Sequence, residues 1–379
     1  MSDSGLGLPA GASAKAGAGG SGLETTRSHR LLSVERLTAG FDKAGRFLPA
    51  IIDVTFSISA GETLCLVGES GSGKSLTALA LIRLLPASAR ITTGAIRLNG
   101  RDLMGVGEPE MERVRGGEIG FVFQEPATAL NPVFTIGRQI EETLRIHARA
   151  TRGTARARAI ELLEWVRVPD PHRRVDDYPH QLSGGLRQRA LIALALAGEP
   201  KLLIADEPTT ALDVTIQAQI LELLRALQER FGLGLLLITH DLGVVAEMAD
   251  RVGIMYAGRL VEHAPVKALF ADPKHPYTRG LLESIPGGTP GTKLHAIQGT
   301  VPPLGALPKG CSFITRCPDR FEPCPDAHPA DTVFVLPPEG ARHTTSPPPE
   351  PGGVRVQAEE RSVKCYLHGP AIEPPEAPG

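Results

Sequence analysis

Residues 68–75 read Gly-Glu-Ser-Gly-Ser-Gly-Lys-Ser and fit the spacing Gly-x-x-x-x-Gly-Lys-Ser/Thr. The apolar run 62–67 before them predicts a strand, and the apolar run 76–85 after them predicts a helix. Glycines let such a loop curl until several backbone N–H groups point at one anion, and the start of a helix adds favourable partial charge. The spacing therefore predicts a loop that binds phosphate groups. The residues expected to contact them are Gly68, Ser70, Gly71, Ser72, Gly73, Lys74 and Ser75.

Two acidic residues suited to metal-assisted phosphate chemistry follow a second apolar run, 202–205. The run predicts a buried strand that ends at Asp206 and Glu207, and parallel sheets bind ligands outside the carboxyl ends of their strands. Asp206 is expected to hold Mg²⁺ together with the Ser75 hydroxyl. Lys74 is expected to supply a fixed charge to the β- and γ-phosphates. Glu207 is then placed to polarise an attacking water.

The elements that must position these residues alternate between strands and helices. Runs 201–205 and 235–239 are apolar without polar alternation, which is typical of strands in a buried parallel sheet. The helical period of 214–231 lies between them, so the sequence predicts an α/β domain with a parallel sheet. Period-two alternation over 51–58 predicts a further strand. The mostly helical stretch 126–197 predicts an insertion into the domain.

Composition limits the class of protein. The 379 residues hold 40 Lys and Arg against 42 Asp and Glu, and the net charge of −2 excludes a nucleic-acid binder held by a large basic excess. The chain has neither an apolar run of about 18 residues nor the pattern of a secretory signal, so a reducing cytosolic compartment is expected. Residues 1–30 are rich in Gly, Ala and Ser and predict a disordered leader. Residues 286–379 hold 19 of the 33 Pro and predict an irregular tail or small module.

Taken together, the motifs resemble those of ATP-binding cassette (ABC) ATPases, over about residues 31–265. Phe41 occupies the place of the aromatic residue that stacks on adenine, and the neighbouring Phe47 is the alternative. The resemblance implies an α/β fold of the P-loop NTPase type, with a RecA-like parallel sheet core, an antiparallel β subdomain and an inserted helical subdomain. The other matching elements are Gln124 after an apolar run, the signature Leu-Ser-Gly-Gly-Leu-Arg-Gln-Arg at 182–189, Ala-Leu-Asp at 211–213, and His240.

The resemblance also implies roles for these residues, because two such cassettes sandwich ATP head to tail. Gln124 and His240 would join Glu207 as catalytic residues around the γ-phosphate, and Gln124 would be a further Mg²⁺ ligand. Asp213 would belong to the D-loop. The residues that would contact the nucleotide held by the partner cassette are Ser183, Gly184 and Gly185.

A narrower resemblance is to the ATPases of oligopeptide/dipeptide importers. It rests on four stretches: 128–132, 178–185, 209–220 and 275–279. Leu186, after Ser-Gly-Gly, resembles the first of the two ATPase subunit types that these systems pair. The resemblance implies an ATP-hydrolysing subunit on the cytoplasmic face of a bacterial inner membrane. The partners it implies are a second ATPase subunit, two transmembrane permease subunits and, indirectly, a solute-binding protein. A soluble ABC ATPase that remodels protein or nucleic acid is the alternative function.

The remaining expectations concern the C-terminal part. The nucleotide-binding domain is expected to span 31–285 and to contain the helical subdomain at about 126–197. A small irregular C-terminal module is expected at 286–370, followed by a disordered tail at 371–379. The sequence of this module resembles the C-terminal tail of peptide-importer ATPases. The resemblance implies a 4Fe–4S cluster bound by four thiolates. Thiolate ligation also suits Zn²⁺, and free thiols remain a third reading. The cysteines concerned are Cys311, Cys317, Cys324 and Cys365.

Overall fold

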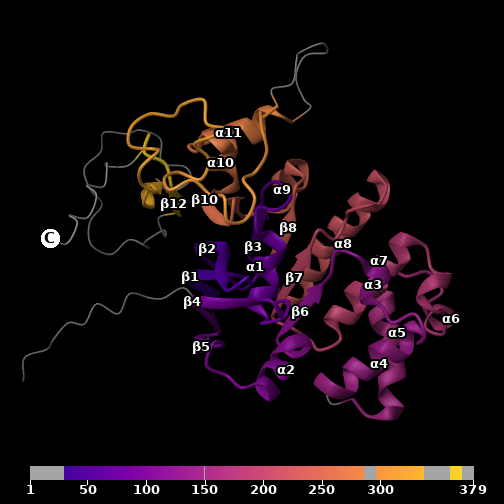
Figure 1. Cartoon of the computed structure of the whole chain (residues 1–379). Helices are drawn as coiled ribbons and strands as arrows, with labels where there is room; N and C mark the ends of the chain where they lie inside the picture. Colours follow the sequence, from indigo (N-terminus) through magenta and orange to yellow (C-terminus); the bar gives the residue numbers. More distant parts are fainter. Residues whose placement is uncertain (1–29, 149, 286–295, 337–358, 369–379) are drawn as a thin grey trace, which may run out of the picture.

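The computed structural model describes residues 30–148, 150–285, 296–336 and 359–368 (Figure 1). The predicted leader and C-terminal tail lie outside the described residues, apart from Arg30. The strands of the described chain are β1 (Arg30–Lys43), β2 (Arg46–Ser59), β3 (Thr63–Val67), β4 (Ala89–Leu98), β5 (Arg101–Asp102), β6 (Ile119–Val122), β7 (Leu202–Asp206), β8 (Gly234–Thr239), β9 (Arg251–Tyr256), β10 (Arg259–Pro265), β11 (Thr332–Leu336) and β12 (Glu359–Val363). Its helices are α1 (Lys74–Leu81), α2 (Glu108–Gly117), α3 (Pro126–Ala129), α4 (Ile136–His147), α5 (Arg152–Trp165), α6 (Pro171–Arg174), the 3₁₀ turn η1 (Pro179–Gln181), α7 (Gly184–Leu196), α8 (Val214–Phe231), α9 (Leu242–Met248), α10 (Val266–Ala271) and α11 (Pro276–Glu283).

The main sheet has the strand order β11-β12-β10-β9-β3-β8-β7-β6. The strands β9, β3, β8, β7 and β6 pair in parallel, which confirms the predicted parallel core. Each central strand is buried along its whole length because both faces of the sheet are covered. Their carboxyl ends meet at one edge of the sheet, and the phosphate loop follows β3 there.

Successive side chains of the central strands face two separate cores, because side chains alternate across a strand. Leu203 and Leu237 pack into a core that also holds residues of α4, α5, α7, α8 and α9. Ile204 and Leu236 pack into a second core with α1 and with the antiparallel sheet β2-β1-β4-β5. The molecule is therefore layered, with the main sheet between helices on one face and α1 with the small sheet on the other.

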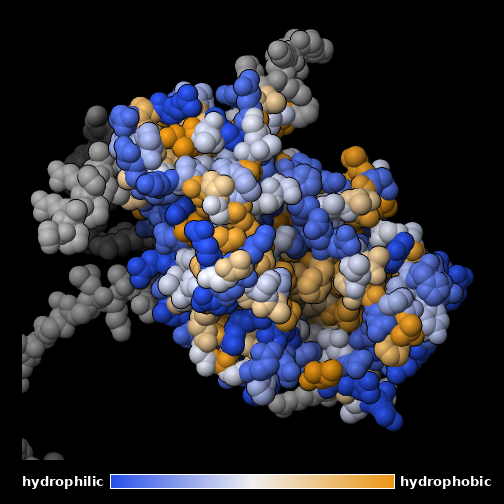
Figure 2. All heavy atoms as spheres, viewed as in Figure 1, coloured by the Kyte–Doolittle hydropathy of each residue, from blue (hydrophilic) through white to orange (hydrophobic). Residues whose placement is uncertain are grey.

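Helices α3 to α7 connect β6 to β7 and lie to one side of the main sheet (Figure 1). Three of them begin at side-chain caps, since Thr135, Thr151 and Ser183 accept hydrogen bonds from backbone N–H groups of α4, α5 and α7. Figure 2 shows polar side chains spread over the visible face of the molecule, with apolar ones in small groups. Within the ranges given above, no helix is long and apolar enough to cross a membrane.

The C-terminal part is more closely joined to the main sheet than the sequence indicated. The Pro-rich composition predicts an irregular tail, but β12 pairs with β10 and β11 pairs with β12, so two late strands extend the edge of the main sheet. Arg361 on β12 forms an ion pair with Glu262 on β10, and both side chains are buried, with 3% and 0% of their surface exposed. A buried charge is tolerated only when paired, so this contact aligns β12 with the sheet.

Candidate functional site

The phosphate loop crosses from the end of β3 to the start of α1. Gly71 and Gly73 have φ of +78° and +102°, a region that residues with a Cβ rarely adopt. A Cβ at Gly73 would also lie 3.0 Å from the carbonyl oxygen of Ala50. Helix α1 begins at Lys74, two residues earlier than the apolar run predicts, so that its first N–H groups face the loop.

Lys74 spans the loop. Its Nζ donates hydrogen bonds to the carbonyl oxygens of Gly68 at 2.7 Å and Glu69 at 3.0 Å, and only 5% of the residue is exposed. Burial lowers the pKa of Lys74, whereas the nearby carboxylates of Glu207 and Asp206 act in the opposite direction. A buried cation whose present partners are carbonyls attracts a more strongly charged anion, such as a phosphate.

Asp206 and Ser75 meet beside the loop. The Ser75 hydroxyl donates to Asp206 Oδ1 at 3.0 Å, and Asp206 is 6% exposed. Burial raises the pKa of Asp206, and the hydrogen bond from Ser75 opposes that rise. A carboxylate and a hydroxyl are oxygen donors of the kind that Mg²⁺ prefers, so these two residues fit the metal expected of them.

Glu207 is the point at which the remaining polar residues converge. Its Oε2 lies 3.3 Å from Gln124 Nε2, 3.3 Å from His240 Nδ1 and 2.8 Å from the Thr210 hydroxyl. Its backbone has φ of +46°, which is costly for a residue with a side chain. The three expected catalytic residues thus come from three different strand ends and meet at one oxygen. The third contact is Thr210, which no motif in the sequence singles out, although it lies within the matched stretch 209–220.

The signature and D-loop residues lie elsewhere on this chain. Ser183 caps α7, with its hydroxyl accepting from the Leu186 N–H at 3.4 Å, and Ser183 and Gly184 are exposed. Asp213 caps α8, and the next residue, Val214, is 82% exposed. Over the described ranges, no hydrogen bond or ion pair joins these residues to the phosphate loop. The single chain therefore carries two separate parts of the expected site.

The two candidate stacking residues lie on the β1–β2 hairpin. Phe47 is covered by Arg90, whose guanidinium carbon is 5.0 Å from the ring centroid. Phe41 is half-buried and pairs with Leu48 on β2 and Ala89 on β4. A cation therefore covers one face of Phe47, and no cation–π contact is found at Phe41 within the described part of the chain.

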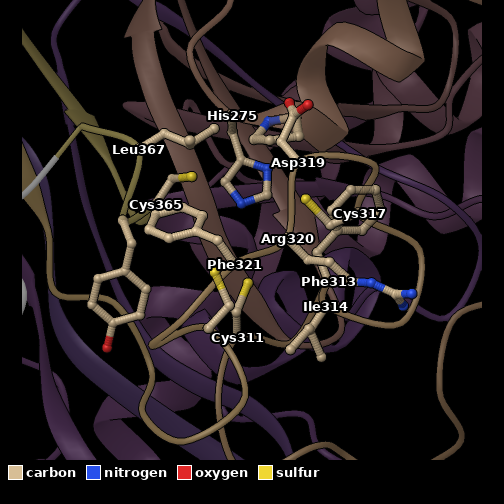
Figure 3. A pocket seen from close by; sticks show the side chains of 13 residues that line it. His275, Cys311, Phe313, Ile314, Cys317, Asp319, Arg320, Phe321, Cys365 and Leu367 are labelled. Atoms are coloured by element: carbon tan, nitrogen blue, oxygen red, sulfur yellow. The ribbon is translucent and has the colours of Figure 1, made fainter.

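The four late cysteines line one narrow cavity, together with His275 (Figure 3). Figure 3 shows Cys317 and Cys365 on opposite sides of this cavity, hereafter the cysteine cavity. No disulfide joins the cysteines in the described part of the chain, and burial raises the pKa of Cys311 and of Cys365 to about 11. Among the described residues, no group of three or more Cys, His, Asp or Glu side chains is placed to hold a metal ion. The fourth cysteine that lines the cysteine cavity is Cys324.

Comparison with known protein families agrees with this site. Residues 51–210 match the family described as ABC transporter. Residues 261–324 match the family described as the oligopeptide/dipeptide transporter C-terminal region. The first match contains the phosphate loop, Gln124, the signature and Glu207, and the second contains three of the four cysteines of the cavity.

Individual relatives agree as well. A protein of Brucella abortus named as a peptide import ATP-binding protein is 52% identical over 312 residues, which are 79% of this chain and 92% of the relative. One of Brucella melitensis with the same description is 49% identical over 319 residues, 84% of this chain and 95% of the relative. Among solved structures, an ATP-binding cassette dimer in a post-hydrolysis state with ADP and phosphate is 29% identical, with a TM-score of 0.56. The match covers 62% of this chain and 98% of the chain in that structure.

Proposed function

Since the chain belongs to the ATP-binding subunits of oligopeptide/dipeptide ABC importers, we propose that it hydrolyses ATP at the site around Glu207 and so drives a membrane permease. The observation that carries the proposal is the meeting of Gln124, Thr210 and His240 at Glu207 Oε2, beside the phosphate loop.

In this proposal the residues of the chain divide the work. Lys74 and the loop N–H groups bind the β- and γ-phosphates, and Phe41 stacks on the adenine. Ser75, Asp206 and Gln124 would hold Mg²⁺, which neutralises phosphate charge when bound. Glu207 accepts a proton from the attacking water, whose position Gln124 and His240 fix. Positioning and charge stabilisation carry most of such a reaction.

A second ATPase subunit would complete the site. Ser183 and Gly184 expose the N-terminus of the 13-residue helix α7, which can bind an anion from another chain. The 82% exposure of the apolar Val214, next to Asp213, is what a subunit interface would cover. With Leu186 after the Ser-Gly-Gly stretch, we propose a heterodimer in which this chain is the first subunit type.

Two permease subunits would dock near Gln124, on the cytoplasmic face of the membrane, and receive solute from a binding protein. Phe123 is 38% exposed and Val133 is 69% exposed, and both flank α3. Apolar side chains exposed beside a catalytic glutamine can transmit closure of the ATP site to a partner.

Co-expression with candidate permease subunits tests this function. We expect the chain to co-purify with them from detergent-extracted membranes and Val133→Asp to reduce that recovery about tenfold, because a charge is buried at the contact. Ile146→Asp is the matched control, since Ile146 is 65% exposed on α4 and should leave recovery unchanged. Full ATPase activity in a stable soluble assembly without permeases would instead support the non-transport alternative.

We further propose that the cysteine cavity holds a 4Fe–4S cluster on Cys311, Cys317, Cys324 and Cys365. What supports it is a set of four thiols in one cavity, because all-sulfur ligation suits iron–sulfur clusters. The thiols with raised pKa would release protons on binding. Four thiolates from distant segments would cross-link the module.

Metal analysis tests the cluster. Protein purified without oxygen should contain iron and labile sulfide and absorb broadly in the visible range, and Cys317→Ser should lose most of all three signals. Cys65→Ala is the control, because Cys65 is buried in β3, away from the cavity. Zinc in place of iron, or protein free of metal, would contradict the proposal.

A further inference from the structure

The second residue of the phosphate loop, Glu69, is held by the C-terminal part of the chain. Its backbone N–H donates to the Tyr277 hydroxyl at 3.0 Å. Its two carboxylate oxygens each accept from Arg316 Nη1 at 3.0 Å. Neither contact is local, since Tyr277 lies on α11 and Arg316 lies next to Cys317. The loop is therefore held by α11, near the end of the range 31–285, and by the C-terminal module through Arg316.

Arg316 is fixed in place before it reaches the loop. Only 4% of its side chain is exposed, and its Nε donates to the carbonyl of Gln298 at 2.9 Å. Its guanidinium carbon lies 5.7 Å from the ring centroid of Tyr256 and 6.0 Å from that of Phe313. Tyr256, Tyr277 and Phe313 also contact one another, with centroid distances of 4.7 to 5.4 Å. A cation packed this way loses little further freedom when it binds Glu69.

The contact with Glu69 bears on the nucleotide because Glu69 also holds Lys74. The Glu69 carbonyl accepts from Lys74 Nζ at 3.0 Å, so one residue joins the phosphate-binding lysine to the C-terminal part. Glu69 also brings a negative charge to a loop that must accept the phosphates of ATP. Without a cation beside it, that charge would repel them. Arg316 is the cation that forms an ion pair with it.

We propose that Arg316 and Tyr277 are positioning residues for the phosphate loop, and that the C-terminal module, through Arg316, sets the affinity of the site for nucleotide. The proposal rests on the proposed function. It assigns the module a part in ATP binding that does not depend on what the cysteine cavity holds.

Calorimetric titration of the full chain with MgADP tests the assignment, because ADP occupies the loop without turnover. Arg316→Gln should raise Kd about tenfold, since it removes a charged hydrogen-bond partner. Glu69→Gln should raise Kd less, because the repulsive charge disappears with the contact. The double variant should bind no more weakly than Arg316→Gln alone, the coupling expected of residues in contact. Tyr277→Phe, which removes one hydroxyl, should raise Kd about threefold.

Steady-state kinetics separate positioning from general damage. For Arg316→Gln, KM for ATP should rise with Kd while kcat at saturating ATP stays within about twofold. Arg316→Lys keeps the charge and should recover part of the affinity. The matched control is Arg279→Gln, because Arg279 lies in the same part of the chain but pairs with Asp319 and not with the loop. It should leave Kd for MgADP unchanged.

Two results would overturn the inference. The first is unchanged MgADP affinity in both Arg316→Gln and Tyr277→Phe, and the second is an equal loss in Arg279→Gln, which would mean that loosening of the module alone weakens binding. Failure of the wild-type chain to bind MgADP at all would instead contradict the proposed function, so the two failures can be told apart.

Discussion

Glu207→Gln is expected to lower the rate of ATP hydrolysis by about 10²- to 10⁴-fold, the usual contribution of a general base, while leaving ATP binding intact. Gln cannot accept the proton of the attacking water, but it keeps the shape of Glu and can still contact Thr210 and His240. The ATP-bound state should therefore accumulate. In the presence of the second ATPase subunit, the two chains should elute as a closed dimer that ATP stabilises.

The rate is measured as phosphate release at saturating MgATP, and dimer formation by size-exclusion chromatography with and without ATP. Glu199→Gln serves as the control, because Glu199 is a surface residue paired with Arg158, away from the loop, and its activity should match the wild type. Phosphate release by Glu207→Gln at the wild-type rate would remove Glu207 from its role.

Lys74→Ala is expected to weaken MgATP binding about a hundredfold, the size typical when one member of a buried charged pair is removed. The substitution leaves the carbonyl oxygens of Gly68 and Glu69 without their hydrogen-bond donor. It also removes the lysine of the loop 68–75, whose buried positive charge would bind the phosphates. Hydrolysis at sub-saturating ATP should fall at least as much.

Equilibrium titration with MgATP measures the change, and thermal melting without nucleotide shows whether the fold persists. The fold should persist, because burial of the Lys74 charge is itself costly. Lys201→Ala, at an exposed position before β7, is the control and should bind like the wild type. If Lys74→Ala kept wild-type affinity, phosphate binding at this loop would be refuted.

The phosphate site could be predicted from the sequence because its parts are local. The loop 68–75 is one continuous stretch between a strand and a helix, so its glycines, Lys74 and Ser75 are brought together by the turn itself. Asp206 and Glu207 directly follow an apolar strand, and strands of a parallel sheet end at a common edge. Gln124 and His240 had to be inferred from a family resemblance, since neither is unusual at a strand end.

The C-terminal part could not be predicted in the same way, because its contacts join residues far apart in the chain. A Pro-rich sequence gives little local signal for β12, and its strand forms because the edge of β10 offers hydrogen-bond partners and Glu262 offers a partner for Arg361. Likewise, the spacing of the cysteines does not indicate that Cys365 returns to the cavity of Cys311, and only the family resemblance grouped the four cysteines together.

The sequence by itself therefore determined the chemistry of this protein: a phosphate loop, a pair of acidic residues at a strand end, and the family to which they belong. Only the tertiary structure decided that Arg316 reaches Glu69 across 247 positions of sequence. The physical reason is that a turn or a helix cap depends on neighbouring residues, whereas an ion pair between distant segments depends on how whole layers pack against one another.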